Sequence, residues 1–124
     1  MRNSNGLQTR RASWRRARKD AVYARTAADD EAGTACREQV RRALELLGTP
    51  ARKVYGDPRR SGLAADRPGL RRLMADVRRG GLRCVVVRDL TRLARSAALL
   101  ETILGELRAA AVELLTVEGA VRHA

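Results

Sequence analysis

This sequence is poor in aromatic residues, and that shortage restricts how the chain can fold. Of its 124 residues, 2% are aromatic and none is Phe. Apolar residues still make up 44% of the chain, so a core is expected that consists mainly of Leu, Val and Ala. Such a core packs through many small contacts rather than through a few large rings. A chain of this length forms one small domain.

Cysteine is also scarce. The chain holds Cys36 and Cys84 alone, which are too few and too far apart for a disulfide framework or a zinc site. A reducing, cytoplasmic location fits this composition, and Cys84 is expected to pack as a small buried hydrophobe. No stretch is long and apolar enough to cross a membrane. We therefore expect a cytoplasmic protein that needs no metal and no other cofactor.

Acidic residues are outnumbered by basic ones. The chain has 26 Lys and Arg against 14 Asp and Glu, which gives a formal net charge of +12. All of these cations except Lys19 and Lys53 are Arg, whose planar fork binds phosphate oxygens in pairs. A GC-rich genome would also raise the Arg and Ala content. Charge and clustering together favour a nucleic acid, and we expect DNA as the partner.

The first 19 residues have no acidic residue and only scattered apolar ones. A segment of this kind cannot offset the entropy of ordering itself, so residues 1–19 are expected to form a mobile basic tail. A transit peptide would also be rich in Arg and poor in acidic residues, although the amphipathic pattern of this segment is weak for one. A start codon assigned too early is a third explanation. The tail cations expected on DNA are Arg10, Arg11, Arg15, Arg16 and Arg18.

After the tail, short apolar runs alternate with segments of helical periodicity. Pro68 stands where a first-turn proline belongs, and Gly48 and the pair Gly80-Gly81 end two helices. This alternation predicts an α/β fold with three layers and a mostly parallel sheet of about four strands over residues 20–119, followed by a C-terminal tail at 120–124. The expected strands are 21–24, 53–55, 82–87 and 112–117, and the expected helices are 34–47, 68–79 and 90–110, the last with a break near Ser96.

Three arginine-containing stretches, 23–27, 66–70 and 90–95, each follow an expected strand. Because the carboxyl ends of parallel strands lie at one edge of a sheet, these stretches are expected on a common rim. Simpler explanations exist for each. Arg92 and Arg95 could be solvated helix residues, Arg67 could flank a helix whose N-cap is Asp66, and Ser61-Gly62 could be an ordinary turn.

These stretches resemble the catalytic domain of serine recombinases, the resolvase and invertase family. The similarity lies in Tyr23-Ala24-Arg25, in Ser61-Gly62 followed by the stretch 66–70 (DRPGL), and in the run 90–95 (LTRLAR). It implies a resolvase-like fold and DNA cleavage through a serine hydroxyl, which attacks a phosphodiester and leaves a 5′-phosphoserine link. It further implies that arginines stabilise the phosphoryl transition state without a metal. The site residues implied are Arg25, Arg67, Arg92 and Arg95, with Gln39 near them and Ser61 on the DNA.

The chain departs from the family in three respects. Ala27 occupies the position of the nucleophilic serine, and its methyl group has no lone pair to attack phosphorus. Thr26 carries a hydroxyl one residue earlier. Because adjacent side chains of an extended strand point to opposite faces, Thr26 is expected to face away from the site. Thr91 stands where the family usually has an aspartate. The sequence ends at Ala124, where family members continue into the long helix through which they dimerise, so we expect a monomer or a weak dimer, with a full-length relative as another partner.

The sequence therefore predicts a recombination-family protein that binds the DNA backbone without cleaving it, as a mobile-element remnant or as a regulator. Two alternatives stay open. One is an active recombinase or another phosphodiester-cleaving enzyme that uses Thr26 or water, and the other is a plain basic nucleic-acid-binding module. Among the remaining polar residues, Asp29, Asp30 and Glu31 are expected in a solvated loop, His123 at a fraying end, and Tyr23 and Tyr55 at the edge of the core.

Overall fold

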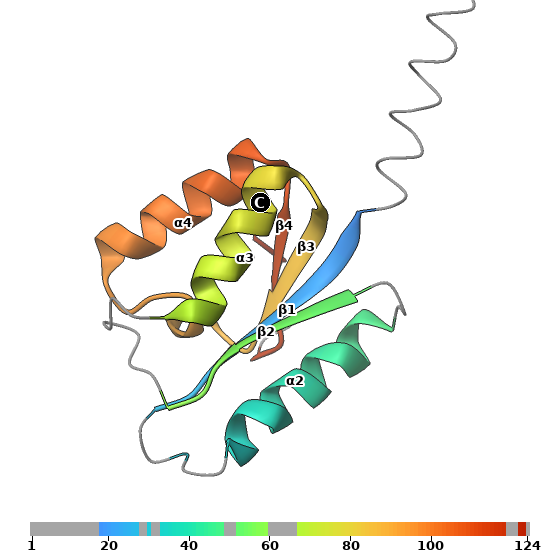
Figure 1. The fold of residues 1–124 in the computed structure, drawn as a ribbon, viewed down its shortest axis with the longest axis vertical. Helices are drawn as coiled ribbons and strands as arrows, with labels where there is room; N and C mark the ends of the chain where they lie inside the picture. Colours follow the sequence, from blue (N-terminus) through green and yellow to red (C-terminus); the bar gives the residue numbers. More distant parts are fainter. Residues whose placement is uncertain are drawn as a thin grey trace, which may run out of the picture.

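In the computed structural model, a five-stranded sheet in the order β2-β1-β3-β4-β5 forms the centre of the domain (Figure 1). The structure describes residues 18–27, 30, 33–48, 52–59, 67–118 and 122–123. Most of the expected tail, the Ser61-Gly62 turn, Asp66 and the acidic neighbours Asp29 and Glu31 lie outside this range.

Four strands are parallel: β1 (Lys19–Arg25), β2 (Arg52–Asp57), β3 (Leu82–Val87) and β4 (Glu113–Thr116). The helices are α2 (Thr34–Leu47), α3 (Pro68–Arg79) and α4 (Ala97–Ala109), and a short 3-10 helix, η1 (Leu90–Arg92), follows β3. The predicted α/β class with about four parallel strands is confirmed. The expected break near Ser96 is also present, since the Ser96 side chain accepts a hydrogen bond from Leu99 N at 3.3 Å and begins α4.

The expected C-terminal tail contains a strand that the sequence did not reveal. β5 (Arg122–His123) pairs antiparallel with β4, with Leu114 opposite His123 and Leu115 opposite Arg122. The prediction that His123 lies at a fraying end is therefore wrong for its backbone. A strand of two residues has no periodicity that a sequence pattern can show, and β4 supplies the pairing.

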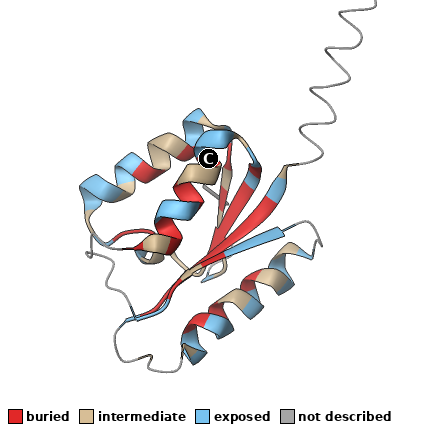
Figure 2. Cartoon of the chain, in the orientation of Figure 1, coloured by how far each residue is buried: buried red, intermediate tan, exposed pale blue. Residues whose placement is uncertain are grey.

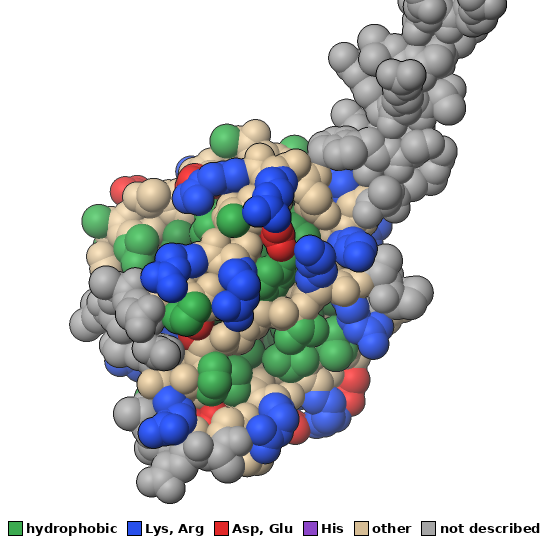
Figure 3. All heavy atoms as spheres, viewed as in Figure 1, with side chains coloured by type: hydrophobic (Ala, Val, Ile, Leu, Met, Phe, Trp, Pro, Cys, Tyr) green, Lys and Arg blue, Asp and Glu red, His purple; other side chains and the backbone are tan. Residues whose placement is uncertain are grey.

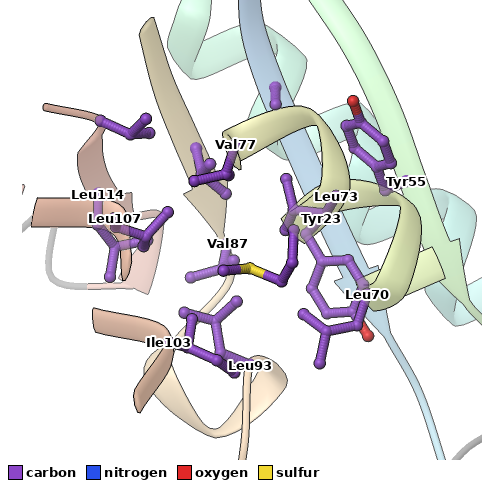
Figure 4. Close-up of a cluster of buried hydrophobic side chains, with 14 of the residues drawn as sticks. Tyr23, Tyr55, Leu70, Leu73, Val77, Val87, Leu93, Ile103, Leu107 and Leu114 are labelled. Atoms are coloured by element: carbon purple, nitrogen blue, oxygen red, sulfur yellow. The ribbon is translucent and has the colours of Figure 1, made fainter. Parts of the chain in front are cut away.

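The helices cover both faces of the sheet (Figure 1). Helix α2 covers one face, where Ala43 packs with Val22, Cys84 and Val86. Helices α3 and α4 cover the other face, where a larger cluster includes Tyr23, Leu73, Val87, Ile103 and Leu107 (Figure 4). Burial runs along β1 and β3 and along one side of each helix, whereas the edge strand β2 is exposed over its first half (Figure 2).

The central position of β3 in the sheet explains why the sequence of this strand is almost wholly apolar. It lies between two parallel neighbours, β1 and β4, and Val85, Val86 and Val87 are fully buried. A strand covered by helices on both faces needs apolar residues at consecutive positions. Cys84, at 5% exposure, is buried in this strand as expected, and its thiol donates to Asp20 Oδ1 at 3.3 Å.

The first strand begins earlier than the sequence predicted. Lys19 is the first residue of β1, and Arg18 donates from Nε to Leu82 O at 2.8 Å and from Nη2 to Ala110 O at 3.1 Å. Lys19 and Arg18, which were expected in the basic tail of residues 1–19, therefore belong to the folded domain, because Lys19 lies in β1 and main-chain carbonyls bind the Arg18 guanidinium. Arg18 precedes β1 whereas Arg25 ends it, so the two arginines lie at opposite ends of the sheet.

Candidate functional site

Three of the arginines that the sequence singled out lie together at the carboxyl end of the sheet. Arg25 is the last residue of β1, Arg67 immediately precedes α3, and Arg92 ends η1 just after β3. Arg25 is 1% exposed and Arg67 is 2% exposed, which makes them the largest fully buried side chains among the described residues. Three separate segments thus place guanidinium groups at one position.

The guanidinium groups bind the main chain of the loop between β3 and α4. Arg25 donates from Nε to Arg92 O at 3.1 Å and from Nη2 to Thr91 O at 2.6 Å. Arg67 donates from Nη1 to Leu93 O at 2.5 Å and from Nη2 to Arg92 O at 2.6 Å. Arg92 in turn donates from Nη1 to Arg25 O at 3.2 Å. In this state the cluster holds residues 91–93 in place.

The cluster is electrostatically suited to an anion. Burial lowers the pKa of Arg25, and the charges of Arg67, Arg92 and Arg95 lower it further. The Nε atoms of Arg67 and Arg92 are buried and have no hydrogen-bond partner within the described part of the chain. Arg95 is exposed and acts on the cluster through its charge. A negatively charged group would relieve the repulsion among these cations.

A buried network of Tyr23 and Asp57 supports Arg67. The Tyr23 hydroxyl donates to Asp57 Oδ2 at 2.6 Å and accepts from Arg67 Nη2 at 2.8 Å, and the guanidinium carbon lies 5.5 Å from the centre of the Tyr23 ring. Burial and the bond to Asp57 raise the pKa of Tyr23. Tyr23 was expected at the core edge, and at 1% exposure it lies inside the core.

Sequence reasoning missed Asp57. Its carboxylate accepts from Gly69 N at 2.7 Å and from Leu70 N at 2.9 Å, so it satisfies two of the free N–H groups at the start of α3. A negative charge is also favoured at this end of a helix. The one signal in the sequence was an Asp just after an expected strand, eleven residues before a first-turn Pro68, and a pattern of neighbouring residues does not reveal a pairing over that separation.

Gln39 contacts Arg25 through the backbone and not through the guanidinium. Its Nε2 donates to Arg25 O at 3.0 Å, and its Oε1 accepts from Arg25 N at 3.3 Å. The side chain is 8% exposed. This pair of bonds fixes the main chain of β1 where Arg25 leaves the strand. Gln39 therefore lies beside the cluster, where the resemblance placed it.

The two residues after Arg25 differ sharply in exposure. Ala27 is exposed, whereas Thr26 is 5% exposed and donates from Oγ1 to Asp30 Oδ2 at 2.7 Å. Asp30 also accepts from Ala35 N at 3.0 Å and from Cys36 N at 3.1 Å, at the start of α2. The hydrogen bonds from Thr26 and Ala35 lower the pKa of Asp30. Asp30 lies in a loop, as expected, and its carboxylate in addition accepts hydrogen bonds from the first turn of α2.

Within the described ranges, no three His, Cys, Asp or Glu side chains are grouped so that they could hold a metal ion. None of the helices in the described part of the chain has the length and apolar content to cross a membrane.

Comparison with known proteins assigns the family. The model of the resolvase N-terminal domain matches residues 21–123. The chain belongs to the resolvase family of serine recombinases. This assignment confirms the resemblance drawn from the three arginine stretches, and it makes the chain a serine-recombinase-like DNA recombination domain.

Solved structures agree with this resolvase fold. A resolvase family site-specific recombinase from Streptococcus pneumoniae is 26% identical, with a TM-score of 0.70 over 85% of this chain and 75% of that chain. A serine recombinase from Sulfolobus solfataricus is 25% identical, with a TM-score of 0.70 over 81% and 68%. The N-terminal catalytic domain of TP901-1 integrase, at 23% identity, has the same fold, with a TM-score of 0.70 over 85% and 81%. The comparison with curated proteins gave no match.

Proposed function

We propose that this resolvase-family domain binds the phosphate backbone of DNA and does not cleave it. The observation that carries the proposal is Ala27, an exposed methyl group two residues after the buried Arg25. The resemblance places the nucleophilic serine at this position. Without a hydroxyl there, the cations can attract a phosphate, but no side chain at this position can form the phosphoester. Such a domain is a regulator of an active relative or the remnant of a mobile-element recombinase.

The structure disfavours Thr26 as a replacement nucleophile. Its hydroxyl is buried, donates to Asp30 Oδ2 and accepts from Arg59 N at 3.3 Å. An attack on phosphorus would require this hydroxyl to leave both partners and turn out of the fold. Asp30 would then lose a hydrogen bond at the start of α2.

Phosphate binding would begin at the exposed part of the cluster. Arg95 is exposed and Arg92 is partly exposed, whereas the N–H groups of Arg25 and Arg67 point to carbonyls of residues 91–93. A phosphate that displaced these carbonyls would accept paired hydrogen bonds from the two guanidinium groups. Displacing the carbonyls would require η1 to move. Elsewhere on the surface, Lys and Arg outnumber acidic side chains on the face shown in Figure 3, which favours weak contact with a polyanion.

The absence of cleavage is tested by trapping covalent protein–DNA adducts. The wild-type chain is incubated with supercoiled plasmid and with a random-sequence duplex, denatured, and analysed by gel and by peptide mass. We expect no adduct. Ala27→Ser is expected to give at most a feeble phosphoserine adduct, because nucleophile, positioning and charge stabilisation act as a unit.

Ala98→Ser is the matched control, since it adds the same hydroxyl at an exposed position of α4. Thr26→Val removes the neighbouring hydroxyl and keeps the shape of the side chain. An adduct on the unmodified chain that Thr26→Val abolishes would make Thr26 the nucleophile and refute the proposal. An adduct that persists in Thr26→Val would refute it as well.

Backbone binding is tested by its dependence on salt. With a fluorescent mixed-sequence duplex of about 30 base pairs, affinity should fall with a log–log slope of about 0.9 per phosphate contacted. Arg95→Gln should reduce that slope by about 1, whereas Arg108→Gln, an exposed change at the end of α4, should leave it nearly unchanged. An affinity that does not respond to salt would contradict the proposal.

A further variant tests the tail and replaces Arg10, Arg11, Arg15 and Arg16 by Gln, which should weaken binding equally on every sequence.

A further inference from the structure

A carboxylate lies next to the arginine cluster in the turn between β3 and η1. Asp89 Oδ1 accepts from Thr91 N at 3.0 Å and also from the Thr91 hydroxyl. Asp89 Oδ2 lies 3.5 Å from Arg92 Nε and 3.8 Å from Arg88 Nε. The two oxygens therefore have different partners, one fixed by Thr91 and the other facing cations.

Asp89 is charged in this setting. Burial alone would raise its pKa, but the hydrogen bonds from Thr91 and the charges of Arg92 and Arg88 outweigh that effect and lower the pKa. The Arg92 side chain is 16% exposed and that of Asp89 is 27% exposed, so solvent screens this pair only partly. The pair can therefore influence where the Arg92 guanidinium lies.

Arg92 connects the rest of the cluster. Its main-chain oxygen accepts from both Arg25 Nε and Arg67 Nη2, and its own Nη1 donates to Arg25 O. The Arg92 Nε, by contrast, is buried without a hydrogen-bond partner among the described residues, and Asp89 Oδ2 is the carboxylate oxygen beside it. A change in the charge of Asp89 would thus be felt directly by the guanidinium that ends η1.

We propose that Asp89 is the positioning residue for Arg92, and that Thr91 holds the Asp89 carboxylate in place. Asp89 thus supplies the carboxylate that the family usually has at position 91, where this chain has Thr91. The inference rests on the proposed function only insofar as Arg92 is positioned for a DNA phosphate. Asp89 is a residue that the sequence pattern did not single out.

A simpler role for Asp89 is that of an N-cap for η1, through the bond from Thr91 N. Substitution by Asn separates the two roles, because Asn caps a helix as well as Asp does but carries no charge. Asp89→Asn therefore keeps the cap and removes the attraction for Arg92. Glu118→Gln is the matched control, since it removes one exposed negative charge that pairs with Arg88 at 2.7 Å and is not among the ion-pair partners of Arg92.

The first readout is the exchange rate of the Arg92 Nε–H proton, measured by NMR on the full chain and assigned with Arg92→Lys. We expect exchange about fivefold faster in Asp89→Asn than in the wild type, the change that corresponds to losing one partly exposed ion pair. Glu118→Gln should leave the rate unchanged. Asp89→Asn/Thr91→Asp should restore it, since the Thr91 side chain already contacts the Asp89 carboxylate. Equal rates in Asp89→Asn and Glu118→Gln, or no restoration by Thr91→Asp, would overturn the proposal.

The second readout is affinity for the fluorescent duplex. Removal of any negative charge should by itself tighten binding to DNA, and Glu118→Gln measures that effect. If Asp89 positions Arg92, Asp89→Asn should instead bind about fivefold more weakly than Glu118→Gln. Equal affinities of the two variants would contradict the inference. If the wild-type chain does not bind DNA at all, the proposed function fails, and the exchange rate of Arg92 still decides the role of Asp89.

Discussion

Asp57→Ala is expected to lower the free energy of unfolding by about 3–5 kcal/mol, the range for removing one partner from a buried charged network. The carboxylate is 2% exposed and accepts hydrogen bonds from the Tyr23 hydroxyl, Gly69 N and Leu70 N. Alanine would leave all three donors without their acceptor, and each unsatisfied buried donor costs about 1–3 kcal/mol unless water reaches it. Urea unfolding followed by circular dichroism measures the loss.

Asp76→Ala is the matched control for this prediction. Asp76 also accepts a hydrogen bond from a tyrosine, Tyr55, and it pairs with Lys53 at 3.3 Å and Arg79 at 3.1 Å. Its side chain is 16% exposed, and its cationic partners are mostly in solvent, so a loss of about 1 kcal/mol is expected. Similar losses in the two variants would show that the Asp57 network does not stabilise the start of α3 as its geometry indicates.

The fold could be predicted from the sequence because its signals are local. The helix 34–47 and the strand 82–87 were placed at the bounds that α2 and β3 have in the structure. Glycine in the left-handed conformation ends two helices, with φ of +59° at Gly48 and +80° at Gly80. These features depend on neighbouring residues alone. The strand β5 depends on pairing with β4 over a distance, and it was missed.

The sequence predicted the cations of the candidate site but not the groups that they bind. Topology placed Arg25, Arg67 and Arg92 at one rim, and the structure brings them together. The sequence did not reveal that Arg25 and Arg67 donate to the carbonyls of residues 91–93, because main-chain acceptors have no sequence signal. Asp57 and Asp89 were missed for a related reason. Both carboxylates accept hydrogen bonds from main-chain N–H groups, in α3 for Asp57 and in η1 for Asp89, and such donors have no sequence signal either.

Gly69→Ala is expected to destabilise the domain by about 3 kcal/mol, the upper part of the range for inserting a methyl group into packed structure. A Cβ atom at this position would lie 2.4 Å from Gly56 O, 2.8 Å from Gly56 C and 3.0 Å from Asp57 Cγ. The first two atoms belong to the backbone of β2, so no side chain can rotate to make room. The start of α3 would have to move away from the sheet, and the bonds from Gly69 N and Leu70 N to Asp57 would lengthen with it.

Gly105→Ala separates this steric effect from helix propensity. Gly105 lies inside α4, and a Cβ there would meet no atom within 4 Å. Alanine is the better helix former by about 1 kcal/mol, so Gly105→Ala should stabilise the domain by roughly that amount. The two Gly→Ala changes are therefore expected to shift the urea midpoint in opposite directions. If Gly69→Ala also stabilised the domain, the close approach of α3 to β2 would not constrain position 69.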